Sequence, residues 1–351
     1  MRRRIPLQAA VAALATAAAA IGLASAGLAA ASAATSGATP LPAHVFAPYF
    51  EAYDTSGGSP STLSQESRSK FLSMAFLQTA SAGSCTAYWN GDTSMPIAQS
   101  SFGSDISAIQ AAGGNVIPSF GGYSADSTGT DIADSCTNVS KIAAVYEKVI
   151  TTYNVPRIDL DIESNSLTDT AGINRRDEAV AKVEAWAKTN GRSIQFSYTM
   201  PSTTTGMTSG EEGIIQNAIS DGATVSVVNM MTFDYYIGTK QNMLTDAESA
   251  AADTVGQLQT LYPSMSMSQL WAMIGITEMP GIDDYGPDET FTKPQAVHLE
   301  TWAASQGIST LTFWALQRDN GGCPGTKGAG TCSGITQPTW YFSHRFEPFT
   351  S

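Results

Sequence analysis

Residues 158–163 read Ile-Asp-Leu-Asp-Ile-Glu, so that apolar and acidic side chains alternate along the chain. In a β-strand this period of two places Asp159, Asp161 and Glu163 on one face and the aliphatic side chains on the other. Three carboxylates in one row repel one another, and burial raises the pKa of at least one of them. The row therefore suits a site that needs one protonated and one ionised carboxyl group. The alternative is an edge strand with its acidic face in water, which the wholly aliphatic opposite face disfavours.

Residues 1–33 have the pattern of a secretory signal peptide. The basic start MRRR is followed by an Ala-rich apolar stretch, and small-residue cleavage sites end at Ala26 and Ala33. Small residues dilute the hydrophobicity of this stretch, so it predicts a signal peptide and not a membrane anchor. We expect cleavage after Ala33, a linker over residues 34–43 and a single domain over residues 44–351. The mature protein is then secreted, extracellular and soluble.

The charge and the histidine content narrow the classes of function. The chain has 31 acidic and 18 basic residues, a net charge of −13, and three basic residues belong to the signal peptide. Such a surface repels phosphate backbones and anionic lipids, so we expect neither a nucleic acid nor a membrane partner. The three histidines are far apart in the sequence, which disfavours a zinc site or a Ser-His-Asp triad. We expect a monomer with a neutral substrate, no metal and no organic cofactor.

The four cysteines predict two disulfide bonds, because an even number in an exported protein is typical of disulfides. Cys323 and Cys332 flank a Gly-rich loop and are expected to pair locally. Cys85 and Cys136 are then left to pair with each other and to join two loops.

Strand-like and helix-like segments alternate from residue 44 onward. The expected strands are 44–50, 70–77, 115–120, 157–162, 193–199, 225–233, 270–276 and 310–314. The expected helices are 101–112, 140–153, 174–189, 211–220, 245–262 and 294–306. Eight strands alternating with helices predict an α/β fold, a (β/α)₈ TIM barrel in a single domain. A doubly wound open sheet is the alternative, but no G-x-G-x-x-G follows an early strand.

The ends of the expected strands carry polar, aromatic and glycine residues. Strand three ends in Ser119-Phe120-Gly121-Gly122, where the glycines allow backbone to approach a ligand or a neighbouring strand closely. Strand six ends with an acid and two phenols (Asp234, Tyr235, Tyr236), and strand eight ends at Trp314, a flat surface for a sugar ring. In a TIM barrel these ends meet at the face that holds the active site.

These motifs together resemble family 18 glycoside hydrolases, the chitinase family, and most closely small bacterial chitinases whose strand-four motif ends in DIE. The matching segments, in order, are SFGG, DLDIE, SYTMP, VVNMMTFDYY, IGITEMPGIDD and FWALQRD. The resemblance implies that Glu163 is the general acid and then the base. It also implies that Asp161 orients the substrate acetamido group, and that Asp159 sits behind Asp161 and shares its proton.

The same resemblance implies a set of substrate-binding residues. They are Tyr49, Ser119, Gly121, Gly122, Tyr198, Asp234, Tyr235, Trp314 and Gln317. The chain departs from the family at Phe233, where many members have a tyrosine, so Tyr235 is expected to supply that hydroxyl. It also has Pro156 and Arg157 where the longer family motif begins with Asp-Gly, which we expect to change packing but not activity.

The implied activity is hydrolysis of β-1,4 linkages in chitin, with retention, by attack of the substrate's own acetamido group. There are two alternatives, and the first of them shares the same acids. One is an endo-β-N-acetylglucosaminidase acting on N-glycans, and the other is a barrel that binds chitin without cutting it. The loop aromatics Tyr88, Trp89, Tyr123 and Trp314 favour a linear polymer, and the presence of Glu163 favours an enzyme.

Overall fold

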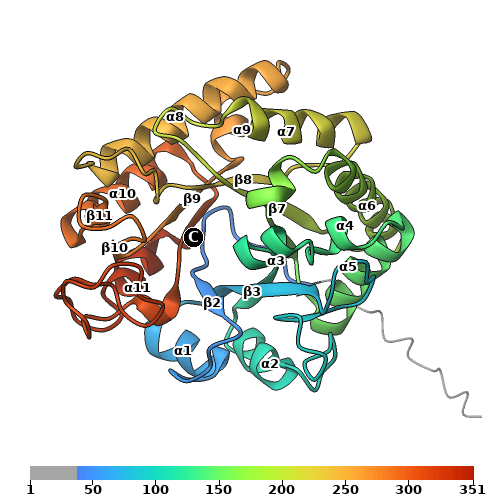
Figure 1. Ribbon diagram of the computed structural model, residues 1–351, viewed down its shortest axis with the longest axis horizontal. Helices are drawn as coiled ribbons and strands as arrows, with labels where there is room; N and C mark the ends of the chain where they lie inside the picture. Colours follow the sequence, from blue (N-terminus) through green and yellow to red (C-terminus); the bar gives the residue numbers. More distant parts are fainter. Residues whose placement is uncertain (1–37) are drawn as a thin grey trace, which may run out of the picture. The chain divides into compact units, whose positions relative to one another are not determined.

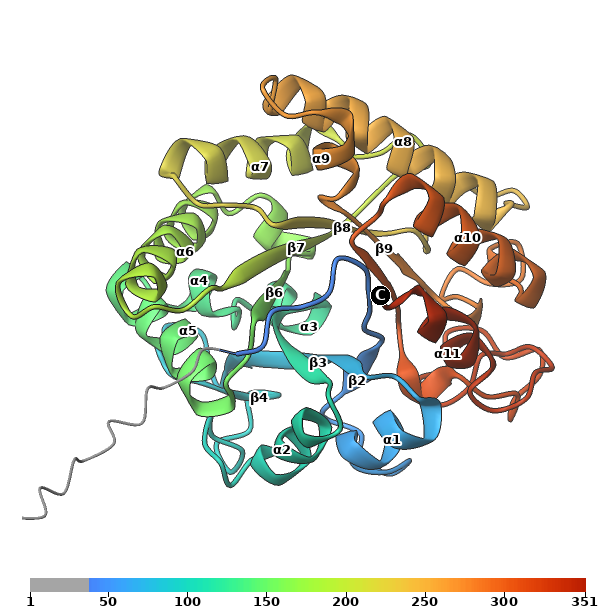
Figure 2. The ribbon, with the colours of Figure 1, turned by 180° about the vertical axis from the view of Figure 1, so that it is seen from behind.

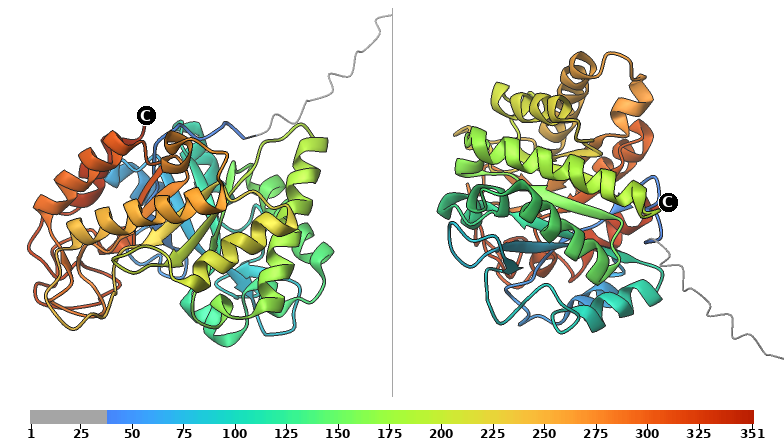
Figure 3. Two further views of the ribbon diagram at one scale, coloured as in Figure 1. Left: turned by 90° about the horizontal axis from the view of Figure 1, so that it is seen from above. Right: turned by 90° about the vertical axis from the view of Figure 1, so that its right-hand side faces the viewer.

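Parallel strands and helices alternate along residues 38–351, the part of the chain that the computed structural model describes. The strands lie in the centre and the helices surround them (Figure 1). The same arrangement is visible from behind (Figure 2) and from two further sides (Figure 3). The expected signal peptide and the start of the expected linker lie outside the described residues.

The parallel sheet closes on itself through a first strand that is split in two. Its order is β1-β12-β9-β8-β7-β6-β5-β3-β2, in which β1 (Val45–Phe46) pairs with β12 and β2 (Tyr49–Glu51) pairs with β3. Pro48 lies at the split and has no N–H to donate, while its carbonyl accepts the N–H of Ser73 at 3.0 Å. Because β1 and β2 are halves of one strand, the fold is the expected (β/α)₈ barrel.

The remaining barrel strands follow the expected order. They are β3 (Phe71–Thr79), β5 (Asn115–Gly121), β6 (Arg157–Asp161), β7 (Gln195–Pro201), β8 (Val227–Met231), β9 (Ile274–Glu278) and β12 (Thr310–Phe313). The longer helices are α1 (Pro60–Ser67), α2 (Gly103–Ala111), α5 (Val139–Tyr153), α6 (Thr170–Thr189), α7 (Ser209–Asp221), α8 (Met243–Leu261) and α10 (Lys293–Gln306). Shorter elements are β4 (Ala87–Trp89), α3 (Tyr123–Thr128), α4 (Ile132–Ser135), α9 (Met267–Trp271), β10 (Gly281–Ile282), β11 (Thr290–Phe291) and α11 (Tyr341–Phe346).

One expected strand begins later in the structure than the sequence predicts, and two expected helix ends are confirmed. Residues 270–271 were expected to open strand seven, but they end the short helix α9, which a Ser266–Gln269 capping box starts. The strand itself begins only at Ile274. The expected helix stops at Gly222 and Gly307 are confirmed, since both adopt the left-handed conformation that favours glycine, with φ of 76° and 80°.

Strand register decides which side chains face the barrel interior. Ser119, Asp159 and Ser197 lie side by side across β5, β6 and β7, and their side chains meet inside the barrel. The next residues along the strands, such as Leu160 and its partner Tyr198, are buried against the helix layer. The barrel therefore has a polar interior near its carboxyl end and an apolar layer between strands and helices.

The two ends of the described barrel lie together. The N–H of Ser351 donates to the carbonyl of His44 at 3.2 Å, and the N–H of His44 donates to the carbonyl of Ser351 at 3.4 Å. Within residues 38–351, the helices are too short or too polar to cross a bilayer.

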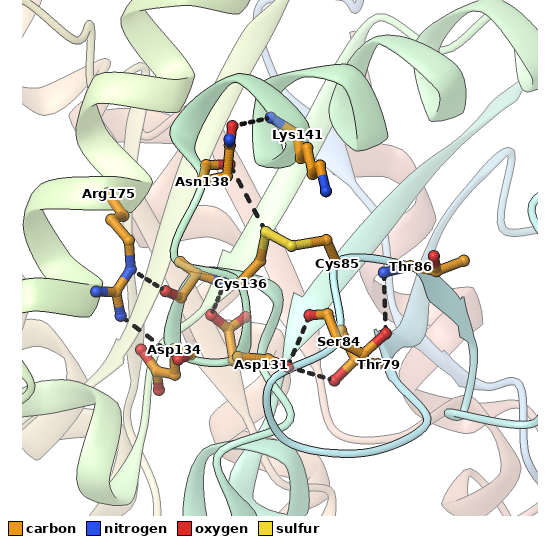
Figure 4. Close-up of a disulfide and its surroundings, with 12 residues drawn as sticks. Thr79, Ser84, Cys85, Thr86, Asp131, Asp134, Cys136, Asn138, Lys141 and Arg175 are labelled. Atoms are coloured by element: carbon orange, nitrogen blue, oxygen red, sulfur yellow. Dashed lines mark hydrogen bonds between the residues drawn. A yellow bond between two sulfur atoms is a disulfide. The ribbon is translucent and has the colours of Figure 1, made fainter.

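Both expected disulfides are present. Cys85, which follows β3, is joined to Cys136, the residue that ends α4, with 4.7 Å between their Cα atoms. Figure 4 shows this bond beside Arg175 of α6, whose Nε donates to the carbonyl of Ala133 at 2.7 Å. The disulfide and this hydrogen bond attach α4 firmly to the barrel.

The two disulfides should differ in their effect on stability. The sequence separation is 51 residues for Cys85–Cys136 and 9 residues for Cys323–Cys332. For loops of these lengths the chain-entropy relation gives contributions of roughly 4 and roughly 2.5 kcal/mol to the free energy of unfolding. We therefore expect replacement of Cys85 and Cys136 by serine to lower the melting temperature more than replacement of Cys323 and Cys332. Thermal unfolding of both double variants checks the order, and the reverse order would contradict it.

Candidate active site

Asp159 is the most heavily hydrogen-bonded carboxylate of the acidic row. Its oxygens accept four hydroxyl groups at 2.6–2.9 Å, from Tyr49, Ser119, Ser197 and Thr199. The side chain is buried, with 2% of its surface exposed. Four donors fill the acceptor capacity of an ionised carboxylate. The hydrogen bonds of Asp159 thus come from hydroxyl groups, and the expected sharing of a proton with Asp161 stays a prediction.

The hydroxyl network continues across the barrel interior. Thr199 Oγ1 accepts a hydrogen bond from Asn229 Nδ2 at 2.9 Å, and Asn229 Oδ1 accepts the hydroxyl of Thr277 at 3.0 Å. One polar layer therefore connects β2, β5, β6, β7, β8 and β9 directly below the carboxyl end of the barrel. Sequence reasoning found Tyr49 and Ser119 but missed the partners on β7, β8 and β9, although their alternation with apolar residues was a visible signal.

Asp161 lies two residues after Asp159 along β6, and one of its oxygens is buried without a hydrogen-bond partner among the described residues. Its side chain is buried, and Oδ1 has no hydrogen-bond partner among the described residues. Burial raises the pKa of Asp161 well above its usual range, and the nearby charges of Glu163 and Asp159 raise it further. A carboxyl group of this kind is suited to binding an N–H group of a ligand.

Glu163 lies two residues after the end of β6, in an extended backbone conformation. Burial raises the pKa of Glu163 to about 7, and a hydrogen bond from the backbone N–H of Tyr123 opposes that shift. A carboxyl group that titrates near neutrality can give up and retake a proton at the pH where an exported protein works. This is the behaviour expected of a general acid and base.

An aromatic surface lies beside the acidic row. The ring of Trp314 stacks on Phe76 with 5.5 Å between ring centres and 13° between planes, and Tyr49 lies 5.7 Å from Trp314. Trp314 directly follows β12, Phe76 lies within β3 and Tyr49 begins β2, and these strands are neighbours in the barrel. Phe76 was missed by sequence reasoning, because a phenylalanine in an apolar strand looks like an ordinary core residue.

The two glycines after β5 serve the close approach of strands. Gly121 and Gly122 have φ of 94° and 84°, and a Cβ at Gly121 would overlap the carbonyl of Asp161. The N–H of Gly122 donates to that carbonyl at 3.0 Å. The glycines thus let β5 lie against β6 where the acidic row ends.

Two expected substrate-binding residues are in the wrong place for that role. Tyr198 faces the helix layer, where its hydroxyl donates to Asp177 of α6 at 2.8 Å, because its register partner is the outward-facing Leu160. Gln317 is buried and uses its amide on backbone groups: Nε2 donates to the carbonyls of Glu51 and Asp54, and Oε1 accepts the N–H of Glu51. Both residues stabilise the barrel around the site.

The hydroxyl group of Tyr235 is buried and has no hydrogen-bond partner among the described residues. Burial raises the pKa of Tyr235 well above its usual range, and the charges of Glu278, Asp246 and Glu289 raise it further. That Tyr235 replaces the family phenol missing at Phe233 stays a prediction. Trp89, expected among the loop aromatics, is likewise buried, and its indole donates to Tyr153 at 2.9 Å.

Asp234 belongs to a group of carboxylates that joins two loops. Oxygens of Asp234, Asp283 and Glu289 lie within 4.8 Å of one another, a spacing that a metal ion could bridge. Each carboxylate, however, accepts two backbone N–H groups from the loops after β8 and β9. These bonds explain the cluster as a cross-link between the loops. Burial and the charges of Asp283 and Asp284 raise the pKa of Asp234 to about 7.

Exposed tyrosines surround the same end of the barrel. Tyr53, Tyr123 and Tyr236 have 48%, 68% and 61% of their surface exposed, and they follow β2, β5 and β8. Tyr236 packs edge-on against Tyr285 of the next loop, with 5.3 Å between ring centres. Aromatic rings on the carboxyl side of a barrel are available to stack on the apolar faces of sugars.

Curated relatives of the chain are chitinases. The chain is 30% identical over 320 residues to the probable bifunctional chitinase/lysozyme of Escherichia coli (strain K12), covering 88% of this chain and 35% of that protein. It is 29% identical over 288 residues to endochitinase 11 of Metarhizium anisopliae, covering 79% of this chain and 53% of that protein. The chain therefore spans less than two thirds of the length of either relative. No protein-family model matches it.

Solved structures show the same architecture. The catalytic domain of a hyperthermophilic chitinase from Pyrococcus furiosus has a TM-score of 0.78 and 30% identity, covering 89% of this chain and 97% of that one. Catalytic-site mutants of active domain 2 of the Pyrococcus chitinase, with the same score, have been solved in complex with chito-oligosaccharides. A family GH18 chitinase from Cycas revoluta, with a TM-score of 0.54 and 10% identity, shares the fold.

A parallel barrel with this acidic row at the carboxyl end of its fourth strand defines a glycoside hydrolase fold and site. The match to the Pyrococcus domain covers 97% of that domain at 30% identity, and it shows the family: the chain belongs to family 18 of the glycoside hydrolases.

The raised carboxyl pKa values predict how stability depends on pH. Asp134, Glu163, Asp234 and Asp126 have folded-state pKa values of about 6, 7, 7 and 9, well above those of an unfolded chain. Between about pH 4 and these values the folded protein binds more protons than the unfolded chain, so the free energy of unfolding falls as pH rises. We expect a higher melting temperature at about pH 5 than at about pH 8. A melting temperature that rises over this interval would contradict the prediction.

Proposed function

We propose that this protein is a secreted chitinase that hydrolyses β-1,4 linkages between N-acetylglucosamine units with retention of configuration. The single observation that carries the proposal is the acidic row: Asp159 held by hydroxyl donors, buried Asp161 without a hydrogen-bond partner for Oδ1 among the described residues, and Glu163 with a pKa of about 7. The aromatic surface of Trp314 and Phe76 beside the row suits a sugar ring. The chitinase relatives and the chito-oligosaccharide complexes of the Pyrococcus domain support the substrate class.

In the first step Glu163 gives its proton to the glycosidic oxygen, and the bond between that oxygen and the anomeric carbon breaks. The carbonyl oxygen of the substrate's 2-acetamido group attacks the anomeric carbon and forms a cyclic oxazolinium ion. Asp161 binds the acetamido N–H and orients the carbonyl oxygen toward the anomeric carbon. As the positive ring forms, the proton of Asp161 passes to Asp159, and the negative charge left on Asp161 stabilises the ring. Asp159 is held below by its hydroxyl donors and returns the proton when the ring opens.

In the second step the ionised Glu163 takes a proton from water as that water attacks the anomeric carbon. The oxazolinium ring opens, the acetamido group is restored, and Glu163 is protonated again. Two displacements on the same carbon give net retention. The residues that act in both steps belong to this chain and need no added group.

Export from the cell is part of the proposal. Two disulfide bonds in a chain of this length are typical of an oxidising compartment. The pattern of residues 1–33 gives the route, a cleaved secretory signal peptide.

Glu163→Gln removes the proton donor while preserving the shape of the side chain. We expect turnover of chito-oligosaccharides to fall by at least about 10³-fold, because the variant loses general acid catalysis in the first step and general base catalysis in the second. The matched control is Glu66→Gln, an exposed residue of α1, which should leave turnover unchanged. Turnover of Glu163→Gln within about tenfold of wild type would remove Glu163 from the mechanism.

Asp161→Asn tests the attack by the substrate. The amide can still bind the acetamido group but carries no charge to stabilise the oxazolinium ion, so turnover should fall strongly. A thiazoline analogue of the intermediate should inhibit the wild type well and the variant poorly. Cello-oligosaccharides, which lack the acetamido group, should remain uncut. Their hydrolysis at a rate comparable to that of chito-oligosaccharides would require a carboxylate of the protein as the nucleophile and contradict the mechanism.

A high-mannose glycoprotein tested beside the chito-oligosaccharides separates the proposal from its nearest alternative. Release of the glycan, with no cleavage of chito-oligosaccharides, would make the protein an endo-β-N-acetylglucosaminidase. Binding of both substrates without cleavage would make it a sugar-binding barrel.

A further inference from the structure

The segment that carries Glu163 is held from one side by α3 and α4. Directly after Glu163, the hydroxyl of Ser164 accepts a hydrogen bond from Ser127 of α3 at 3.0 Å. The side-chain amide of Asn165 donates to the carbonyl of Ser127 at 3.2 Å, and the hydroxyl of Ser166 donates to Asp134 of α4. The short helices between β5 and α5 therefore bind the turn that follows β6 over several consecutive residues.

Glu163 itself has two contacts with α3. Its backbone N–H donates to Oδ2 of Asp126, and its side-chain carboxyl accepts the backbone N–H of Tyr123. The first contact fixes the main chain, and the second lowers the pKa of the carboxyl group. Since both partners belong to the same six-residue helix, the position of Glu163 follows the position of α3.

Asp126 lies in an unusual environment for a carboxyl group. Its side chain has no exposed surface, and Oδ1 has no hydrogen-bond partner among the described residues. Burial, with a contribution from the charge of Asp131, raises its pKa to about 9, and the hydrogen bond from Glu163 and the charge of Arg176 oppose the shift. The carboxyl group is accordingly neutral at pH 7, so it accepts the N–H without adding a negative charge beside the acid.

The charged groups around Asp126 come from three neighbouring elements. They are Asp131 and Asp134 of α4, Asp161 and Glu163 of the β6 segment, and Arg176 of α6. The hydrogen bond to Glu163 is the contact that links Asp126 to the acidic row. Burying the carboxyl group of Asp126 with one unpartnered oxygen lowers the stability of the fold. An apolar residue at this position would avoid that cost, so packing alone does not require an aspartate here.

We propose that Asp126 is a positioning residue that holds the backbone of Glu163 and thereby keeps the carboxyl group of Glu163 in its buried, reactive position. This inference rests on the proposed role of Glu163 as the acid and base. It assigns to a residue of the β5–α5 connection a part in the reaction that the acidic row itself does not reveal.

The test compares Asp126→Ala and Asp126→Asn with wild type on a chito-oligosaccharide. Asp126→Ala removes the acceptor, so we expect kcat to fall roughly tenfold or more, with KM changed by less than about twofold. Asp126→Asn keeps a neutral acceptor oxygen for the N–H and should restore most of kcat. If Asp126→Ala yields no folded protein, Asp126→Ser, whose hydroxyl is too short to reach the N–H, replaces it with the same expectation.

The pH profile gives a readout that a merely structural role would not move. In wild type, kcat/KM should fall as pH rises through about 7, where Glu163 loses its proton. In Asp126→Ala the carboxyl of Glu163 is freer to reach water, so its pKa falls and this alkaline limb moves to lower pH. In Asp126→Asn the limb should return to its wild-type position.

Asp177→Ala is the matched control. Asp177 is also fully buried, but it accepts Tyr198 and Asn217 in the helix layer and has no contact with the acidic row. Asp177→Ala should lower the melting temperature without changing the pH profile or kcat. The proposal is wrong if Asp126→Ala keeps the wild-type kcat and pH profile, if Asp126→Asn is as impaired as Asp126→Ala, or if Asp177→Ala reproduces both effects.

Glu163→Gln, measured on the same substrate, separates this inference from the proposed function. If Glu163→Gln is inactive and Asp126→Ala behaves as wild type, only the positioning role fails. If Glu163→Gln retains activity, the proposed function fails and the role of Asp126 fails with it.

Discussion

The hydrogen bonds to the buried carboxyl group of Asp159 are the interaction on which the rest of the site depends. An ionised carboxyl group inside a barrel is very costly unless hydrogen bonds replace its water. Here four hydroxyl groups from β2, β5 and β7 replace it, and each of those strands is thereby positioned relative to β6. The carboxyl group that they hold lies directly below Asp161. The same four bonds thus hold the barrel together at this level and fix the side chain on which the acidic row is built.

Much of this fold follows from the sequence because its signals are local. Alternation over residues 158–163 located β6, and the chain order of strands and helices predicted the barrel. Tyr49 and Ser119 were expected in the site and do meet Asp159. Tyr198 was misplaced because a motif match says which strand a residue belongs to but not which face it occupies. The register with Leu160 would have corrected this.

Other features depend on contacts that no local pattern encodes. Gln317 looked like a polar group at a strand end, but its side-chain amide forms hydrogen bonds with backbone groups more than 260 residues away in the chain. Asp126 lies 37 residues before Glu163, in a helix too short to predict from periodicity. Leu270 and Trp271, the last two residues of α9, were expected to open the next strand because they begin an apolar run that continues into β9. In each case the tertiary partner decided the role of the residue.

The split first strand has a consequence for how the chain folds. Its N-terminal half pairs Val45 with Thr310, so the barrel closes only when segments from opposite ends of the domain meet. Bringing such distant segments together carries a large entropic cost, and contacts of this kind slow folding. Until β12 is in place, β9 presents an open edge with unpaired backbone groups, a template for association with other chains. Protection from aggregation is therefore complete only when β12 has paired with both β9 and β1, so that the sheet loses its edges.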